Sequence, residues 1–304
     1  MKKVIIFGGT GFIGTALAEY LSQHKFHPIV IGRTKSDARF DFVQWDGINN
    51  GAWADTLNHA YAIVNLVGKS VDCIKTPLNI DEILKSRVDA TRLIGEALKS
   101  VANPPNIWVQ MSTAHIYGDS ETRVADEDST LGYGLAPFVG KHWEAAFQES
   151  ALAETRKVVL RTGFVLDKTG GAFMKLKQIA RLGLGGKVGS GKQGMSWIHM
   201  QDLNRFITQA LTDENVNGVY NVSAPQPLNN SDFMAVLRKK LQIPFGLSSP
   251  LFVLKLGAKL FFKTDYELLV YGRFVISKRL EALGFQFTYL DLDSALNHLI
   301  KNDD

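Results

Sequence analysis

Three glycines with a fixed spacing lie close to the start of the chain, between a short apolar run and an amphipathic segment. Gly8, Gly11 and Gly14 directly follow the apolar residues 4–7, and apolar residues then recur at helical spacing. In a strand–turn–helix unit, the first glycine permits the tight turn, the second lets a diphosphate approach the backbone, and the third lets the helix pack on the strand. Unpaired N–H groups at the helix N-terminus attract the phosphates. The motif therefore predicts a dinucleotide site rather than a coincidental glycine-rich turn.

The first half of the chain alternates apolar runs with amphipathic segments. Alternation of this kind specifies a parallel sheet with right-handed crossovers and helices on both faces. We therefore expect an α/β fold built on a doubly wound parallel sheet, the Rossmann arrangement. Buried strands are predicted at residues 4–7, 28–31, 62–67, 107–111 and 158–160, and a long helix over 80–98.

The second half of the chain predicts a smaller C-terminal substrate lobe that grows out of the sheet. Residues 183–194 hold six glycines in twelve positions, so we expect a loop there. Asp202 and Ser231 are expected to cap the N-termini of two helices. Short strands are predicted at 197–199 and 219–222. The expected organisation is a Rossmann domain over 1–165, which also receives about 196–224, and a mainly substrate-binding lobe over 166–304.

Composition excludes several classes of protein. The 304 residues include one cysteine, Cys73, which excludes an internal disulfide and disfavours a cysteine-rich metal site, so we predict no metal. The chain opens with no leader-like segment and has no apolar run long enough to span a bilayer, so we expect a cytoplasmic protein without stable membrane insertion. The net charge of +4 is too small to indicate nucleic-acid binding.

Basic residues are unevenly distributed along the chain. Residues 168–194 and residues 233–264 each contain six lysines or arginines and no acid. This pattern favours a small anionic substrate, with a solvated basic face as the alternative. In the second stretch, Lys255, Lys259 and Lys263 recur on an apolar segment, which either packs on the lobe or lies on a membrane surface.

The residues after the second predicted strand bear on the choice of dinucleotide. An NAD site usually has an acid there to hold the ribose 2′-hydroxyl. This chain instead has Arg33 and Lys35, with no acid before Asp37. A guanidinium matches the geometry of a 2′-phosphate. We therefore predict NADP(H), and a merely solvated Arg33 is the alternative.

Several stretches together carry a family resemblance: residues 8–14, 65–68, 86–91, 112–118, 143–144, 161–166 and 277–285. The most specific stretch runs from residue 183 to Asp202. The chain resembles the extended short-chain dehydrogenase/reductase superfamily, and more closely its atypical epimerase-like branch of YfcH-type proteins with a C-terminal DUF1731 segment. The likeness covers nearly the whole length, with Ser277 where the branch usually has proline.

The resemblance implies an NADP(H) site without an established reaction. Arg87 is equally well explained as a surface residue of its helix. Carried over by motif, the cofactor contacts are expected from Gly8, Gly11, Phe12, Ile13, Gly14, Arg33, Leu66, Val67, Gly68, Glu82, Arg87 and Val165.

The proton-transfer pair of the superfamily is missing. Its enzymes use a Tyr-x-x-x-Lys pair beside a serine or threonine, in which the lysine lowers the pKa of the tyrosine while nicotinamide exchanges a hydride. No tyrosine here has a lysine four residues later, and Lys141 lies three residues after Phe138. The candidates for proton chemistry are Ser112, Tyr117 and His199, and a buried structural histidine is the favoured interpretation of His199.

Two functions are compatible with these residues. The first is an NADP(H)-dependent oxidoreductase or sugar-nucleotide epimerase whose basic lobe holds a phosphorylated or nucleotide-sugar substrate. The second is a non-catalytic NADP(H)-binding sensor or scaffold, which the missing Tyr–Lys pair suggests. Turnover of a substrate separates the two. In either case we expect a monomer or a homodimer.

Overall fold

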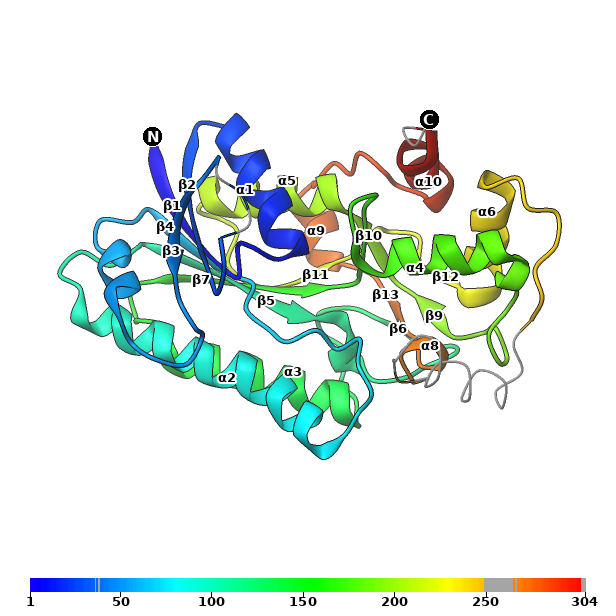
Figure 1. Ribbon diagram of the computed structural model, residues 1–304, viewed down its shortest axis with the longest axis horizontal. Helices are drawn as coiled ribbons and strands as arrows, with labels where there is room; N and C mark the ends of the chain where they lie inside the picture. The colour runs from blue at the N-terminus through cyan, green and yellow to red at the C-terminus, as the bar shows by residue number, and fades with distance from the viewer. Residues whose placement is uncertain (36, 38, 249–264, 266, 302–304) are drawn as a thin grey trace.

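A seven-stranded parallel sheet forms the centre of the protein (Figure 1). The computed structural model describes residues 1–304 except 36, 38, 249–264, 266 and 302–304. The strand order is β11-β7-β5-β4-β1-β2-β3, so the order reverses between β1 and β4. This confirms the expected doubly wound sheet. The strands are β1 (Lys2–Phe7), β2 (Phe26–Gly32), β3 (Asp41–Gln44), β4 (Ala62–Asn65), β5 (Ile107–Thr113), β7 (Arg156–Thr162) and β11 (Gly218–Val222).

Helices cover both faces of the sheet (Figure 1). α1 (Phe12–Gln23) and α5 (Met200–Thr212) lie on one face, and α2 (Pro77–Ser100) and α3 (Leu135–Ser150) lie on the other. The side chains of β1 alternate between two cores: Val4 and Ile6 pack with the α1 and α5 residues, whereas Ile5 and Phe7 pack with α2, α3 and three tryptophans. Burial on both faces explains why these strands are apolar throughout.

A separate hydrophobic core holds together the part of the chain beyond the sheet, which we call the C-terminal lobe. Its core is built from Phe173, Trp197, Phe233, Leu237 and Leu296, among others. The elements outside the central sheet and its four covering helices are η1 (Ala52–Leu57), η2 (Ala114–Tyr117), β6 (Val124–Ala125), β8 (Phe164–Leu166), α4 (Gly171–Ile179), the π-helical η3 (Ala180–Leu184), β9 (Gly194–Met195), β10 (Trp197–His199), β12 (Leu228–Asn229), α6 (Asn230–Lys240), α8 (Glu267–Val270), β13 (Phe274–Val275), α9 (Lys278–Ala282) and α10 (Leu292–Lys301).

Three local expectations need correction. His199, not Asp202, caps α5, and Asp202 lies in the first turn of that helix. Asn229, not Ser231, caps α6, because its side chain accepts from the backbone N–H of Asp232 at 2.8 Å. In α5 an untypical capping residue, a histidine, precedes the expected one, whereas in α6 a typical capping residue, Asn229, lies two positions before Ser231. The predicted loop at 183–194 is shortened by the end of η3 and the start of β9.

The basic segment at 250–263 lies outside the described residues. In the described part, none of the helices combines the length and the apolar character that crossing a bilayer requires.

Candidate dinucleotide and substrate site

The glycine turn between β1 and α1 has the geometry that its spacing predicts. Gly8 has a positive φ of 74°, a backbone conformation that favours glycine. A Cβ on Gly14 would lie 2.5 Å from both the Gly8 oxygen and the Gly9 Cα, so only glycine lets α1 approach the turn this closely. Gly11 is the N-cap of α1 and offers no side-chain cap, and the first turn has no acid. The N-terminal N–H groups of α1 are therefore suited to an anion.

The loop after β4 lies directly beside this turn. A Cβ on Gly8 would meet the Leu66 carbonyl at 3.0 Å, and the Leu66 N–H donates to Phe7 O at 2.9 Å. Val67 N–H donates to the Asn65 side chain at 3.1 Å. Because β1 and β4 flank the point at which the strand order reverses, Leu66, Val67 and Gly68 border the crevice where open α/β sheets bind ligands.

Arg87 of α2 packs against the loop after β4 and hydrogen-bonds to it. Its guanidinium donates to Lys69 O at 3.0 Å and to Ile83 O at 2.9 Å, and it lies 5.0 Å from the centre of the Trp143 ring. A Cβ on Gly68 would lie 2.8 Å from the Arg87 Cζ. Burial lowers the pKa of Arg87 to about 10. Glu82 pairs with Lys69 at the exposed side of the same loop.

Two of the expected cofactor residues come together at the start of α4. The Phe12 ring packs against Gly170 and Gly171, where a Cβ would lie 2.8 Å from the ring carbons. A Cβ on Gly171 would also lie 3.3 Å from the carbonyl of Val165, and Phe12 and Ile13 both pack against the core that contains Val165. These contacts link the glycine turn to the beginning of the C-terminal lobe.

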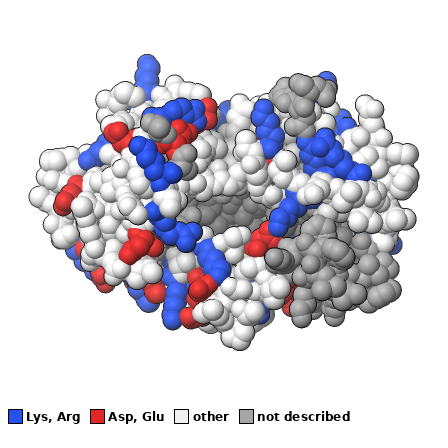
Figure 2. Space-filling view, in the orientation of Figure 1, with Lys and Arg blue, Asp and Glu red and all other residues white. Residues whose placement is uncertain are grey.

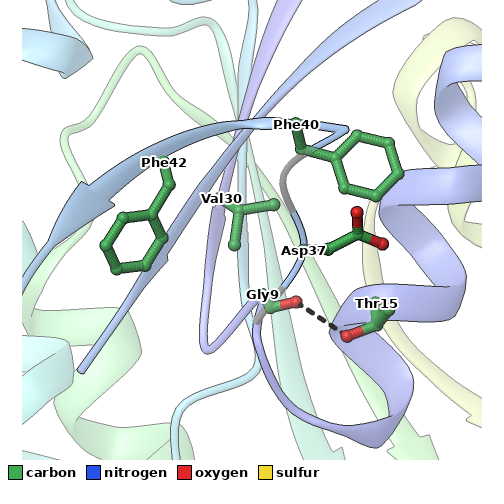
Figure 3. A pocket seen from close by; sticks show the side chains of 6 residues that line it. All are labelled: Gly9, Thr15, Val30, Asp37, Phe40 and Phe42. Carbon is green, nitrogen blue, oxygen red and sulfur yellow. Dashed lines mark hydrogen bonds between the residues drawn. The ribbon is translucent and has the colours of Figure 1, made fainter. Parts of the chain in front are cut away.

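Beyond β2, one arginine is exposed and another holds the nearest acid. The Arg33 side chain is exposed and has no ion-pair partner among the described residues. Asp37 accepts from Arg39 through Nη2 at 2.7 Å and Nε at 3.0 Å, and these hydrogen bonds lower the pKa of Asp37. Figure 3 shows the Asp37 carboxylate and the Phe40 ring over Gly9, in a small pocket that Thr15, Val30 and Phe42 also line.

Ser112 and Tyr117 belong to one buried hydrogen-bond network. Ser112 Oγ donates to Glu144 Oε1 at 2.6 Å, and Arg161 donates to both oxygens of Glu144 at 2.9 and 2.8 Å. Tyr117 Oη accepts from Arg161 at 2.8 Å and donates to Asn221 Oδ1 at 2.8 Å. Burial raises the pKa of Tyr117 against the opposing effect of Arg161. Both hydroxyls are therefore engaged inside the protein.

His199 lies at a different place, where α5 begins. Its Nδ1 accepts from Gln201 N–H at 3.1 Å, and its Nε2 lies 3.2 Å from His298 Nδ1. Burial, reinforced by the charge of His298, lowers the pKa of His199 to about 4. At neutral pH it is an uncharged, hydrogen-bonded histidine, as the favoured interpretation expects.

The region of the missing Tyr–Lys pair contains a different arrangement. Lys141 donates to Gly132 O at 2.8 Å and its Nζ lies 5.3 Å from the centre of the Tyr133 ring. Tyr133 is 91% exposed, and the centres of the Phe138 and His142 rings lie 4.2 Å apart with their planes tilted by 47°. Lys141 therefore hydrogen-bonds a carbonyl, and its contact with tyrosine is to the ring.

Sequence reasoning missed three residues around the carboxyl end of β5. Thr113 is partly exposed, and its hydroxyl accepts from His115 N–H at 3.1 Å. His115 is partly buried beside Phe164, with ring centres 5.5 Å apart. Arg273 is only 7% exposed, and its Nε has no hydrogen-bond partner in the described structure. Thr113 and His115 lie within the stretch 112–118 that carries the family resemblance, and this was the only sequence signal for them. Arg273 lies more than a hundred residues further along the chain, so no motif connected it with them.

The surface between the sheet and the C-terminal lobe is hollowed, with basic side chains around the hollow (Figure 2). Several basic residues of the lobe have partners of their own. Lys175 pairs with Asp72, Lys240 pairs with Asp293 at 2.6 Å, and Arg238 donates to Gly185 O. Among the residues that the structure describes, no cluster of three or more histidine, cysteine or acidic side chains could hold a metal ion.

The reversed strand order, the glycine turn and the loop beside it define a dinucleotide-binding protein of the doubly wound α/β class. Comparison with known families agrees. Residues 4–223 match the NAD dependent epimerase/dehydratase family, and residues 249–299 match DUF1731, a domain of unknown function. The chain belongs to the NAD-dependent epimerase/dehydratase family, and the DUF1731 match confirms the resemblance of the C-terminal segment.

Individual proteins resemble the chain over its full length. The human epimerase family protein SDR39U1 is 33% identical over 98% of this chain and 99% of its own. A crystal structure of human SDR39U1 (isoform 2) with NADPH superposes with a TM-score of 0.88, covering 99% of both chains at 32% identity. A nucleoside-diphosphate sugar epimerase from Corynebacterium glutamicum superposes with a TM-score of 0.79 at 27% identity, covering 98% of this chain and 58% of that one.

Proposed function

We propose that this chain binds NADP(H) at the carboxyl edge of its sheet and exchanges a hydride with a small anionic substrate. The glycine turn fits a diphosphate. α1 lies close to the turn and its N-terminus has no side-chain cap, so its first backbone N–H groups are available to phosphate oxygens at the crevice. The human relative with a known structure was crystallised with NADPH. The residues expected to hold the dinucleotide are those of the glycine turn, Arg33 and the loop at 66–68.

The observation that carries the choice of NADP(H) is the pair of arginines beyond β2. Arg33 is exposed without an ion-pair partner among the described residues, whereas Asp37 is already held by Arg39. A carboxylate that is hydrogen-bonded to a guanidinium is a poor acceptor for a ribose 2′-hydroxyl, and a free guanidinium binds a phosphate in a forked geometry. Both features favour a 2′-phosphate.

Bound NADP(H) would supply the hydride at the nicotinamide. The chain's own residues would orient the substrate at the end of β5, where Thr113 is partly exposed and its hydroxyl retains its donor. The buried Ser112 and Tyr117 would hold this strand end in place through Glu144 and Arg161. Thr113 therefore replaces Ser112 in our proposal as the hydroxyl that faces substrate.

A non-catalytic, NADP(H)-sensing function is the second candidate. It is favoured by the observation that the hydroxyls of Ser112 and Tyr117 are both hydrogen-bonded within the protein, and that Lys141 contacts tyrosine only through the ring. Transfer of deuterium from 4-deuterated NADPH to a panel of carbonyl compounds and nucleotide sugars decides between the candidates. Label in any product supports catalysis, and its absence across the panel with NADPH bound supports the sensor.

Cofactor choice is tested by calorimetry with Arg33→Gln. We expect the wild type to prefer NADPH over NADH, and the variant to bind NADPH about 10- to 100-fold more weakly, because a hydrogen bond to a charged group contributes about 1.5–3 kcal/mol. Affinity for NADH should stay the same. Arg92→Gln on the exposed side of α2 is the matched control and should change neither. Equal wild-type affinity for the two dinucleotides would contradict the proposal.

A further inference from the structure

One buried arginine has no ion-pair partner among the described residues, although the charge of Asp119 partly opposes the effect of burial on its pKa; it lies at the edge of the proposed substrate site. Arg273 is 7% exposed and its Nε has no partner in the described structure. No carboxylate among the described residues lies within ion-pair distance of it. The neighbouring Asp119 is exposed and accepts from the backbone N–H of Gly272 at 2.7 Å. Buried arginines are normally paired, because removing an uncompensated charge from water costs several kcal/mol.

The backbone around Arg273 is firmly held, so its unpaired Nε is not a consequence of a loose segment. Arg273 N–H donates to Gly194 O at 2.8 Å, and Arg273 O accepts from Ser196 Oγ at 2.9 Å. Ser196 Oγ in turn accepts from Val275 N–H at 2.7 Å. The main chain satisfies its hydrogen bonds while the side chain does not, which is typical of a residue that is placed for a ligand.

His115 faces the same place from the end of β5. Burial, and then the charge of Arg273, hold the pKa of His115 well below its usual range, so its ring is neutral beside the guanidinium. The ring contacts Phe164, and the described residues provide no hydrogen-bond partner for its nitrogens. η2, β6 and β13 share one small core here, and Figure 1 shows β6 and β13 beyond the carboxyl end of β5.

We propose that Arg273, with His115 beside it, binds an oxyanion group of the substrate, either a carboxylate or a phosphoryl group. This inference rests on the proposed function and names the group by which the substrate is held. A planar guanidinium presents paired N–H donors to two oxygens of such a group, and a neutral imidazole adds one donor. Two lysines of the lobe, Lys175 and Lys240, are less suited, because each is already paired with a carboxylate.

A comparison of two buried arginines tests this assignment. Arg161 is paired with Glu144 and Tyr117, whereas Arg273 has no such partner. Methionine keeps most of the apolar volume and removes the charge. We expect Arg161→Met to lower the melting temperature of the full chain strongly, because it leaves Glu144 buried and unpaired. Arg273→Met should keep or raise the melting temperature. An equal loss in both variants would overturn the proposal.

Oxyanion binding is then measured with NADPH bound, using sodium glucuronate and inorganic phosphate against sodium chloride at equal ionic strength. We expect one of the two salts to give a saturable rise in the melting temperature of the wild type. Arg273→Met should bind the same anion at least about tenfold more weakly. A response to glucuronate identifies a carboxylate, and a response to phosphate identifies a phosphoryl group. Arg273→Lys, which keeps the charge without the fork, should respond weakly.

Two outcomes would overturn the inference: neither salt distinguishes the wild type from Arg273→Met, or both variants of Arg273 respond like the wild type. NADPH affinity is recorded for each protein in the same experiment. If the wild type binds NADPH but shows no oxyanion effect, only the role of Arg273 is refuted. If the wild type does not bind NADPH, the proposed function itself is refuted.

Discussion

A single ion pair beyond β2 influences which dinucleotide the chain can accept. Arg39 holds Asp37 through three hydrogen bonds and also reaches Glu19 at 3.5 Å. Without Arg39, the Asp37 carboxylate would be free to accept from a ribose hydroxyl and would repel a phosphate nearby. The proposed preference for NADP(H) thus rests on the engaged acid as well as on Arg33.

Arg39→Gln should therefore shift the cofactor preference toward NADH. We expect NADPH to bind roughly tenfold more weakly and NADH severalfold more tightly, because the Asp37 carboxylate is no longer neutralised. Titration of the variant with both dinucleotides at low salt measures the ratio. The double variant Arg39→Gln with Asp37→Asn is the control and should restore the preference for NADPH. A ratio unchanged from wild type would refute the role of this pair.

Adjacent hydroxyls at the end of β5 show what a sequence leaves undecided about single residues. Both Ser112 and Thr113 carry a hydroxyl, and the resemblance selected Ser112, yet successive side chains of a strand point to opposite faces. Ser112 faces α3 and donates to Glu144, whereas Thr113 is partly exposed. The motif predicted a hydroxyl at this strand end, but only the position of Glu144 shows which of the two is engaged.

The contact between β1 and α1 makes the strongest prediction for the helices and strands. Gly14→Ala would place a Cβ 2.5 Å from the backbone of Gly8 and Gly9, so the helix must move away from the turn. We expect a loss of about 1–3 kcal/mol in the free energy of unfolding and at least a tenfold loss of NADPH affinity. Chemical denaturation and calorimetry measure the two effects.

Gly51→Ala is the matched control for Gly14→Ala. Gly51 has an extended backbone with φ of −178°, and the nearest atom to its Cβ would be Trp53 Cδ1 at 3.7 Å, an ordinary contact. It should leave both unfolding and NADPH binding close to those of the wild type. If both variants behave alike, close packing at the glycine turn is not what the third glycine provides.

Most of the sheet could be predicted from the sequence, because strands buried on both faces leave uninterrupted apolar runs. The predicted runs fall within or largely overlap β1, β2, β4, β5 and β7. The edge strand β3 (Asp41–Gln44) was missed, since it is short and only partly buried. The starts of α5 and α6 were misplaced, because a histidine and an asparagine accept the first-turn hydrogen bonds there.

The substrate side of the site could not be predicted, because the fold brings distant segments together there. His115 follows β5, Phe164 begins β8, and Arg273 precedes β13. Ser196 joins them by accepting from Phe164 N–H at 2.8 Å through its carbonyl and donating to Arg273 O. Periodicity and motif spacing report neighbours along the chain, whereas this cluster depends on the packing of the C-terminal segment against the sheet edge.

The C-terminal segment is joined to the sheet at the start of α5. Asp202 is fully buried and accepts from the backbone N–H groups of Thr288 at 2.7 Å and Tyr289 at 3.0 Å. His199 packs on the Tyr289 ring, with ring centres 4.0 Å apart, and contacts His298 of α10. His199 and Asp202, which lie within one turn, thus connect α5 to the C-terminal segment. Protonation of His199 should therefore lower the free energy of unfolding of the whole protein.

Stability should therefore fall with acidity through His199. Its pKa is lowered to about 4 in the folded protein, against about 6.5 in the unfolded chain, so the unfolded state binds the proton more readily. The contribution of this neutral histidine is complete above about pH 6.5 and is lost as the pH falls toward 4, amounting to about 3 kcal/mol.

His199→Asn keeps a helix-capping side chain and removes the titration, so its unfolding free energy should depend less on pH in that range. Urea unfolding between pH 4 and 8 measures this difference, with the exposed His24→Asn as control. If the unfolding free energy of His199→Asn depends on pH as steeply as that of the wild type, protonation of His199 does not weaken the contact between α5 and α10.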